Sequence, residues 1–137
     1  MPPLTVRTVE GSEWELAARN PKDFTFIFFY RGLHCPVCGK YLKNIDQRIG
    51  ELPELGIDAI AISSDAEERA QRSKEKWRMK GLPIGYGLPI ETAREWGLYV
   101  SKAIKEGEPG EFSESALFIV RDGALRASAG ATSCAKT

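Results

Sequence analysis

The sequence predicts a single α/β domain, a three-layer sandwich in which helices cover both faces of a mixed β-sheet. Two patterns carry this prediction. Residues 24–30 are apolar on both faces apart from Thr25, which is typical of a central strand covered on both sides. A helical pattern at 37–52 and a strand pattern at 57–62 follow it. A strand, a helix and a strand in that order form parallel strands joined by a right-handed crossover.

Length and composition restrict the class of protein. The chain has 137 residues, of which 42% are apolar and 28% charged, and we expect residues 1–137 to form one soluble domain. Nineteen basic residues balance nineteen acidic ones, so no net field attracts a nucleic acid or an anionic membrane. The sequence shows neither a leader pattern nor a membrane-spanning run, and it has only three cysteines. We therefore expect a cytoplasmic protein in a reducing compartment.

The first half of the chain contains a hairpin, the central strand, a helix and a second strand. Residues 4–9 and 13–16 alternate at period two around a turn, so we expect an N-terminal β-hairpin. The helix after the central strand has apolar residues at spacings of three and four, namely Val37, Tyr41, Leu42, Ile45, Ile49 and Leu52. Pro53 ends this helix before the next strand.

The second half of the chain is predicted to mix short helices and strands. Ser64, with Glu67 three residues on, forms a capping-box pattern for a helix that runs to Lys80. The remaining expected elements are a short strand and loop at 82–89, a helix at 91–99, a long exposed loop at 101–115, and a hairpin of 116–121 with 124–128. Residues 129–137 are small and polar, so we expect a disordered tail and no closing helix.

Cys35 and Cys38 lie between the central strand and the helix that follows it. We expect Cys35 at the helix N-cap and Pro36 at the first helical position, where its missing N–H costs no hydrogen bond. Unpaired backbone N–H groups and the helix dipole stabilise a thiolate at this end of a helix. Cys38 comes one turn later on the same side, within reach of a mixed disulfide or sulfenic acid formed on Cys35. We expect Cys35 to be at the exposed end of the helix, so the sequence predicts a redox pair in which Cys35 attacks and Cys38 resolves.

The residues around this pair leave alternatives open. His34, as an imidazolium, and Arg31 could stabilise the thiolate of Cys35, or both could be solvated loop residues. A zinc site is formally possible with the ligands Cys35, Cys38, His34 and Cys134. A structural zinc site, however, usually takes its ligands from two paired motifs, and this sequence has a single Cys-x-x-Cys. Cys134 is either a second resolving thiol or a spectator. We expect no metal and no cofactor.

The segment from Phe28 to Cys38, with Tyr41 and Leu42 after it, resembles the peroxiredoxin-like proteins of the alkyl hydroperoxide reductase and thiol-specific antioxidant family. The resemblance covers residues 4–126 and includes the opening hairpin, the segments 82–88 and 93–101, and the strand 117–121. It implies a thioredoxin-like fold and thiol-dependent antioxidant or oxidoreductase chemistry.

The positions that activate a peroxide in the family differ in this chain. Peroxiredoxins carry the active-site pattern Pro-x-x-x-Thr-x-x-Cys. If Cys35 is the peroxidatic thiol, Phe28 and Gly32 stand at the proline and threonine positions; if Cys38 is, Arg31 and Cys35 stand there. Both alignments lack the hydroxyl donor that helps to polarise a peroxide O–O bond.

The resemblance also locates two differences near the end of the chain. The arginine that many peroxiredoxins place before the strand 117–120 falls on Ser115, where thioredoxins have their cis-proline. Family members continue past the last hairpin into a further helix, whereas this sequence ends in a short polar segment. We therefore expect a thioredoxin-like fold that lacks its last helix, with an uncovered apolar sheet face that favours a homodimer.

Three functional hypotheses follow. The first is a thiol-disulfide oxidoreductase of antioxidant type, which acts on a protein or low-molecular-weight disulfide and is restored by a cellular thiol reductant. The second is a thiol-dependent peroxidase that reduces small hydroperoxides. The third is a non-catalytic, redox-responsive binding module of the same fold. None of the three involves a nucleic acid or a membrane.

Overall fold

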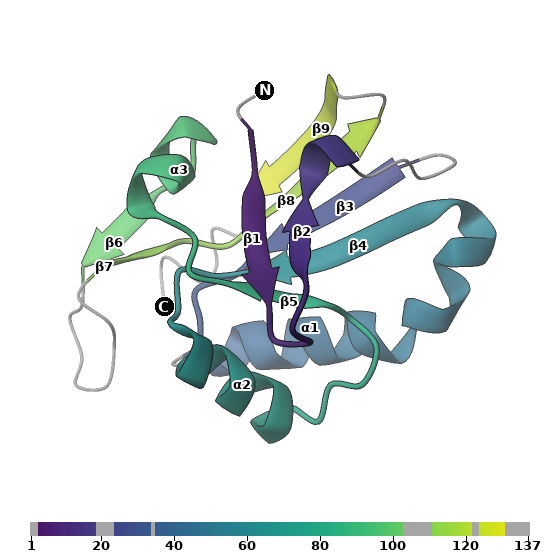
Figure 1. Ribbon diagram of the computed structural model, residues 1–137, viewed down its shortest axis with the longest axis horizontal. Coiled ribbons are helices and arrows are strands. Elements are labelled where there is room, and N and C mark those ends of the chain that lie inside the picture. The colour runs from purple at the N-terminus through teal and green to yellow at the C-terminus, as the bar shows by residue number, and fades with distance from the viewer. Residues whose placement is uncertain (1–2, 19–23, 34, 103–110, 122–123, 131–137) are drawn as a thin grey trace.

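A computed structural model describes residues 3–18, 24–33, 35–102, 111–121 and 124–130 (Figure 1). The strands are β1 (Thr5–Thr8), β2 (Glu13–Glu15), β3 (Phe24–Phe29), β4 (Ile57–Ile62), β5 (Ile84–Tyr86), β6 (Val100–Lys102), β7 (Glu111–Ser113), β8 (Ala116–Arg121) and β9 (Ala124–Gly130). The helices are α1 (Pro36–Gln47), α2 (Glu67–Lys76) and α3 (Ile90–Glu95). Short 3-10 turns lie at Leu16–Ala18, Ile49–Glu51 and Pro53–Leu55.

Seven strands form one mixed sheet in the order β2-β1-β5-β4-β3-β8-β9. The central strands β3, β4 and β5 are parallel, and β3 pairs with β4 from Phe24 opposite Ile57 to Phe29 opposite Ile62. The flanking strands β1 and β8 pair antiparallel with β5 and β3. The mixed sheet and the crossover from β3 through α1 to β4 are confirmed. The carboxyl ends of β3 and β4 meet at one sheet edge, and the two cysteines follow there.

One face of the sheet is covered by α1 and α2 (Figure 1). A buried cluster on this face joins Phe28 of β3 and Tyr30, which follows it, to Leu42 of α1 and Ala70 of α2. Cys35 and Cys38 belong to the same cluster. The two cysteines are therefore part of the packed layer between the sheet and its helices.

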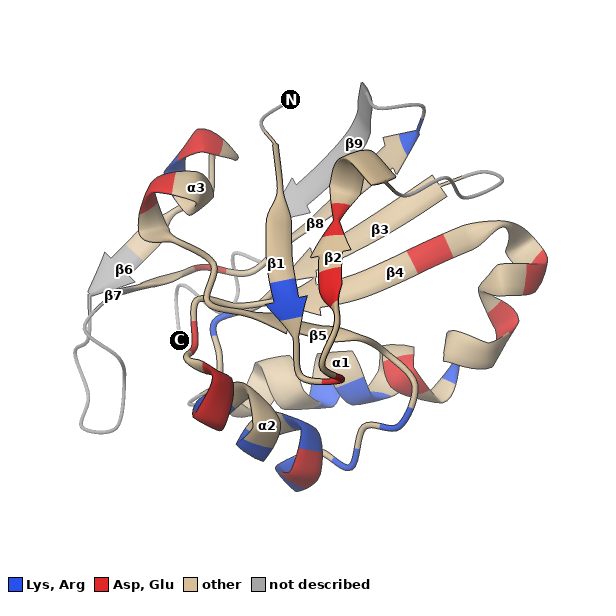
Figure 2. Cartoon of the chain, viewed as in Figure 1, with Lys and Arg blue, Asp and Glu red and all other residues tan. Residues whose placement is uncertain are grey.

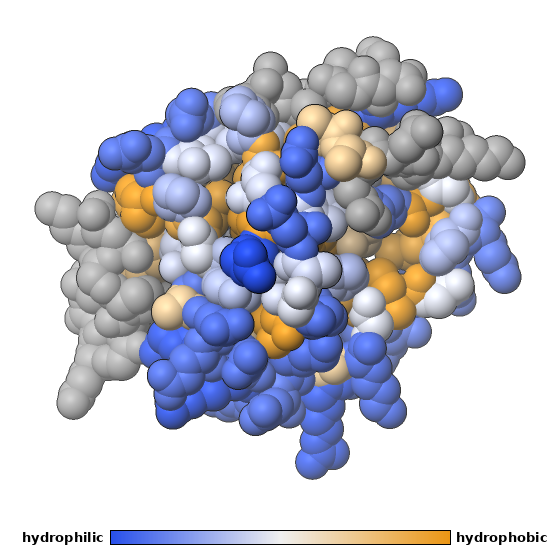
Figure 3. Space-filling model, in the orientation of Figure 1, coloured by the Kyte–Doolittle hydropathy of each residue, from blue (hydrophilic) through white to orange (hydrophobic). Residues whose placement is uncertain are grey.

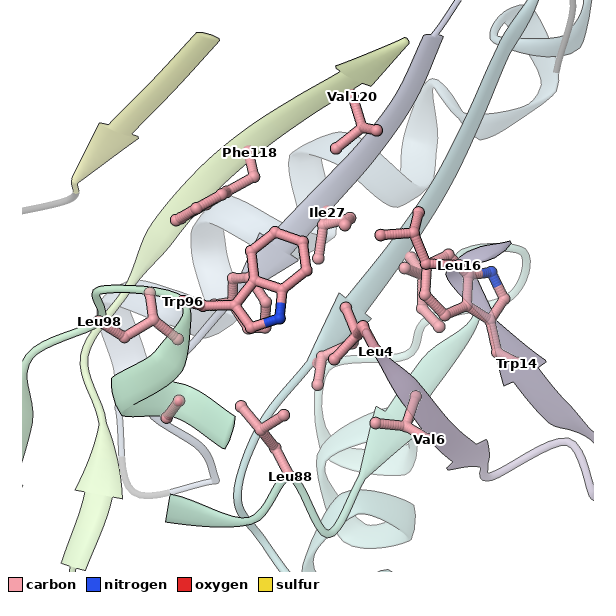
Figure 4. Packing of buried hydrophobic residues seen from close by; sticks show 14 residues of the cluster. Leu4, Val6, Trp14, Leu16, Ile27, Leu88, Trp96, Leu98, Phe118 and Val120 are labelled. Atoms are coloured by element: carbon pink, nitrogen blue, oxygen red, sulfur yellow. The ribbon is translucent and has the colours of Figure 1, made fainter. Parts of the chain in front are cut away.

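The opposite face is covered by α3 and by the β1–β2 hairpin, which folds over the sheet. Figure 4 shows Trp96, which follows α3, packed among Leu4, Ile27 and Phe118. The ring centroids of Trp96 and Phe118 lie 5.2 Å apart in an edge-to-face arrangement. Helices on both faces of the sheet confirm the predicted three-layer fold.

A close approach joins α1 to the segment after α2. A Cβ atom at Gly39 of α1 would lie 2.4 Å from Nε1 of Trp77, so a larger residue would displace the indole. Glycine inside a helix costs about 1 kcal/mol relative to alanine, and here it allows direct packing on Trp77. The Trp77 ring also meets the ring of Tyr30 edge to face, with centroids 6.0 Å apart.

Two helix predictions need correction. The helix expected to reach Leu52 ends as α1 at Gln47, and the 3-10 turn Ile49–Glu51 replaces its last part. The capping box at Ser64 is wrong because α2 begins later, with Ala66 as an N-cap that makes no side-chain hydrogen bond. The Ser64 hydroxyl is buried without a hydrogen-bond partner in the described part of the chain. The chain stays extended at Ala66, which places Ser64 too far upstream to cap the helix.

The long exposed loop expected at 101–115 is wrong in the part that the structure describes. The strands β6 and β7 form a separate antiparallel pair, with Val100 opposite Ser113. Phe112 is fully buried, and Ser113 and Glu114 after it are buried as well. A single aromatic residue among polar neighbours has no periodicity, so the pattern did not reveal this strand.

The terminal hairpin is confirmed as β8 and β9. The strand β9 continues to Gly130, two residues into the segment that we expected to be a disordered tail. The expected turn at 122–123 and the tail at 131–137 lie outside the described residues. No helix in the described part of the chain is long and apolar enough to cross a membrane.

Candidate active site at the dithiol

Cys35 is the N-cap of α1, and Pro36 occupies the first turn, as the sequence predicts. The backbone of Cys35 is extended, with φ −110° and ψ 98°. Its Sγ accepts a hydrogen bond from the backbone N–H of Cys38 at a distance of 3.3 Å. A backbone donor aimed at sulfur from the N-terminus of a helix favours the thiolate. The geometry therefore favours negative charge on Cys35.

Cys38 lies one turn along α1 and is within hydrogen-bond contact of the Cys35 side chain. Its Sγ lies 3.4 Å from Oγ of Ser115, just before β8. The hydrogen bond with Cys35 and then burial raise the pKa of Cys38 far above its ordinary value. The Ser115 hydroxyl and the backbone N–H of Arg31 lower this pKa by less. The raised pKa favours the protonated form of Cys38.

Both cysteines are buried. The exposed fraction is 3% for Cys35 and 2% for Cys38, which corrects our expectation that Cys35 stands at an exposed end. The extended backbone turns the Cys35 sulfur back onto the first turn of α1, where it meets the Cys38 amide. No disulfide joins the two thiols. Hydrogen bonding, and not exposure, distinguishes them.

Asp65, three residues after β4, holds the loop that leads into Cys35. Its Oδ2 accepts the backbone N–H of Leu33 at 2.8 Å, and its Oδ1 pairs with Nε of Arg69 at 3.2 Å. Gly32 has a φ of +134°, and a Cβ there would lie 2.7 Å from the Asp65 carboxylate. Cys35 N in turn donates to Gly32 O at 3.1 Å. A buried carboxylate thus fixes the backbone immediately before the cysteine.

Asp65 and Tyr30 are site residues that the sequence reasoning missed. Tyr30 is buried beside Cys38, and burial raises the pKa of its phenol far above the ordinary value, so the hydroxyl stays neutral. One signal could have identified both residues. Each follows the carboxyl end of a central parallel strand, the edge where α/β sheets place functional groups.

The Arg31 side chain is held by the segment around β7. Its Nε lies 3.0 Å from Oε1 of Glu114, and its guanidinium lies 4.8 Å from the ring centroid of Phe112. Both charged side chains are largely buried. The structure thus brings the Arg31 backbone to Cys38 and pairs the Arg31 charge with Glu114.

The remaining predicted site residues are His34 and Cys134, which lie outside the described residues. Within the described ranges, no three His, Cys, Asp or Glu side chains form a group that could hold a metal ion. The zinc site considered in the sequence analysis needs His34 and Cys134 as ligands, and because both lie outside the described residues, the structure does not test it. The same holds for thiolate stabilisation by His34 and for a resolving role of Cys134.

The geometry of the dithiol agrees with the comparison to known families. The sequence model of the AhpC/TSA family matches residues 1–128. The chain belongs to this family. The family includes the peroxiredoxins, so the resemblance inferred from Phe28 to Cys38 is confirmed. The chain is a thiol-dependent oxidoreductase of the peroxiredoxin-like type.

Solved peroxiredoxin structures share the fold. Peroxidoxin BcpB from Mycobacterium tuberculosis is 17% identical, with a TM-score of 0.75 over 95% of this chain and 82% of that one. Peroxiredoxin Q from Xanthomonas campestris is 16% identical, with a TM-score of 0.75 over 96% and 83%. Peroxiredoxin 6 from Arenicola marina is 21% identical, with a TM-score of 0.73 over 94% and 61%. No curated protein sequence matches this chain.

These similarities confirm the thioredoxin-like fold. The structure also locates Ser115, where the resemblance in the sequence analysis implied an arginine in many peroxiredoxins. Its hydroxyl lies beside the sulfur of Cys38, so this position adjoins the dithiol.

Proposed function

We propose that the chain is a two-electron thiol-disulfide oxidoreductase with Cys35 as the attacking thiol and Cys38 as the resolving thiol. The hydrogen bond from the Cys38 amide to Cys35 Sγ, 3.3 Å long, carries this proposal. It stabilises charge on Cys35 only, and the raised pKa of Cys38 keeps the second thiol neutral until it is needed. Family membership supports thiol chemistry of this kind.

The reaction balances within the dithiol. The Cys35 thiolate attacks one sulfur of a substrate disulfide RSSR, which forms a Cys35–SR mixed disulfide and releases RS⁻. Cys38 passes its proton to the released thiolate and attacks the Cys35 sulfur. This second exchange expels the other RS⁻, which takes up a proton from water, and closes the Cys35–Cys38 disulfide. Two electrons leave the protein, and a cellular dithiol returns them.

Peroxidase activity is the second candidate, because the burial of Cys35 favours small oxidants over large ones. The Cys35 thiolate would attack a hydroperoxide ROOH, break its O–O bond and form Cys35–SOH, while the alkoxide takes a proton and leaves as ROH. Cys38 would then displace the hydroxyl as water and close the disulfide. The absence of the threonine and arginine donors predicts a slow first step.

Two broader expectations remain proposals. The four side chains of Phe24, Phe26, Leu117 and Ile119 are only partly buried, which supports a homodimer through this apolar surface. The composition supports a cytoplasmic location, where a thiol reductant is available.

The test compares three variants: Cys35→Ser, Cys38→Ser and the matched control Cys134→Ser. We expect Cys35→Ser to abolish reduction of both hydroxyethyl disulfide and hydrogen peroxide, and Cys134→Ser to retain it. Cys38→Ser should trap a mixed disulfide on Cys35, which mass spectrometry detects. Full activity of Cys35→Ser would refute the proposal. If the wild-type protein reduces neither substrate, the non-catalytic module is the correct function.

A further inference from the structure

A hollow of about 320 Å³ opens between α1 and α2, beside the cysteine pair. Its lining consists of four uncharged residues, Leu33, Pro36, Gly39 and Trp77, and three lysines, Lys40, Lys43 and Lys76, which we call its rim. Leu33 and Pro36 lie on either side of Cys35 in the chain, two residues before it and one after. The hollow therefore lies at the first turn of α1, although neither cysteine is part of its lining.

The rim of the hollow is strongly basic, although the whole chain is neutral. Figure 2 shows Lys on α1 and a mixture of basic and acidic residues along α2, and in Figure 3 the lower part of the surface, over α2, is hydrophilic. Among the described ion pairs, none involves Lys40 or Lys76. Lys43 Nζ donates to the carbonyl of Arg78, and its charge also acts on the nearby carboxylate of Asp46. Lys40 and Lys76 are thus the two rim lysines that take part in none of the described ion pairs.

A second hollow of about 420 Å³ continues from the first and shares Leu33 and Lys76 with it. It adds Arg72 and Glu75 to its lining, and Arg72 pairs with Glu68 at 2.8 Å. The second hollow thus has an acidic residue in its lining, whereas the charged residues that line the first hollow are all lysines.

We propose that this lysine-rimmed hollow binds the carboxylates of a small anionic disulfide whose sulfur reaches Cys35. The inference rests on the proposed thiol-disulfide exchange and names its substrate class. Three features support it together. The volume lies at the lower end of the range for small-ligand pockets, the rim complements an anion, and the burial of Cys35 excludes bulky substrates.

The uncharged lining of the hollow limits the shape of the substrate. Trp77 lies directly on Gly39, so the indole cannot move toward α1 without a clash. Leu33 is held by the Asp65 carboxylate through its backbone N–H at 2.8 Å. The backbone of Leu33 is thus fixed and the indole of Trp77 is confined on the side of α1. An anion held on the rim would direct its sulfur toward the start of α1.

The test measures rate constants for three disulfides that differ in charge: oxidised glutathione, which carries four carboxylates, neutral hydroxyethyl disulfide, and cationic cystamine. We expect the double variant Lys40→Gln/Lys76→Gln to lower the rate constant for oxidised glutathione about three- to tenfold. The rate for hydroxyethyl disulfide should change less than about twofold, and that for cystamine should rise. High salt should reduce the preference of the wild type for the anion.

Lys80→Gln is the matched control, because it removes the same charge from an exposed lysine that does not line the hollow. We expect it to leave all three rate constants unchanged. Equal effects of the double variant on all three disulfides would mean that the lysines act only on Cys35 ionisation, and would overturn the proposal. No effect on oxidised glutathione would overturn it as well.

A binding measurement separates this proposal from the proposed function. The Cys35→Ser variant cannot exchange, so S-methylglutathione can be titrated into it without chemistry, with tryptophan fluorescence as the readout. We expect binding that weakens about three- to tenfold when Lys40 and Lys76 are both replaced by Gln. Binding without disulfide reduction would refute only the proposed function. Reduction without binding would refute only the hollow as its site.

Discussion

The hydroxyl of Ser115 lies 3.4 Å from the sulfur of Cys38, although 77 residues separate them in the chain. The hydrogen bond between Cys38 and Cys35, and then burial, raise the pKa of Cys38. The contact with Ser115 lowers it by a smaller amount. Ser115 therefore makes the resolving thiol more acidic than it would otherwise be. The contact gives a functional meaning to a residue that is neither the arginine of peroxiredoxins nor the proline of thioredoxins.

Replacing Ser115 with alanine should slow resolution and leave the first attack intact. Without the hydroxyl, the pKa of Cys38 rises further, so less thiolate forms to displace the mixed disulfide. A neutral hydrogen bond contributes about 0.5–1.5 kcal/mol, which corresponds to a decrease of about two- to twelvefold. Stopped-flow release of the second thiolate measures this step. Ser115→Thr retains the hydroxyl and should retain the rate; equal slowing in both variants would contradict the prediction.

Asp65→Ala should loosen the loop before Cys35. The change removes a buried acceptor from the Leu33 N–H and from Arg69, at a cost of about 1.5–3 kcal/mol. We expect a lower free energy of unfolding in urea and faster alkylation of Cys35 by iodoacetamide, because a looser loop exposes the buried sulfur more often. Asp65→Asn keeps one oxygen for Leu33 and should lie between the wild type and Asp65→Ala. Glu75→Gln, an exposed carboxylate of α2, is the control and should change neither quantity.

The local part of the site could be predicted from the sequence. Three signals are local, because each depends on residues within one helical turn or one strand. They are the apolar run of β3, the helical spacing after Pro36, and the preference of proline for the first helical turn. These signals placed Cys35 at the N-cap and Cys38 one turn on. The parallel pairing of β3 with β4 followed from the order of the elements.

The long-range part of the site could not be predicted in this way. Asp65 meets Leu33 across 32 positions, and Ser115 meets Cys38 across 77. Such contacts depend on how two loops meet at the sheet edge, and a single sequence carries no periodic signal for them. The pair β6 and β7 was missed for the same reason, since Phe112 is the only apolar residue of β7 and lies in a polar segment.

Asp46 predicts a pH dependence of stability. Burial opposes its charge, but the backbone N–H groups of Leu82, Gly81 and Lys80 outweigh burial and lower the pKa of this carboxyl. Its Oδ1 lies 2.8 Å from both Gly81 N and Leu82 N. Because the folded-state pKa is below the unfolded value of about 3.9, the carboxylate stabilises the fold above that pH. This contribution is lost as the pH falls through the folded-state pKa.

We therefore expect Asp46→Asn to lower the free energy of unfolding at pH 7 by about 1–3 kcal/mol. The difference from the wild type should shrink as the pH falls below about 4. Urea unfolding followed by tryptophan fluorescence measures both effects. Glu54→Gln, an exposed carboxylate near the same end of α1, should show no such dependence. A difference that stays constant from pH 7 to 3 would exclude the carboxylate as its source.

Glu114 directly precedes Ser115, and its pairing with Arg31 at 3.0 Å holds that serine beside the dithiol. Glu114→Gln leaves the largely buried Arg31 guanidinium without its carboxylate, and we expect a loss of about 2–4 kcal/mol in the free energy of unfolding. The double variant Arg31→Met/Glu114→Gln removes both charges and should recover part of this loss. Urea unfolding of the wild type, both single variants and the double variant gives the coupling energy, which should be about 0.5–3 kcal/mol.

The resolving step should slow in Glu114→Gln at temperatures where the fold is intact, because Ser115 is then less well placed. A coupling near zero, or a normal resolving rate, would show that the ion pair does not position Ser115.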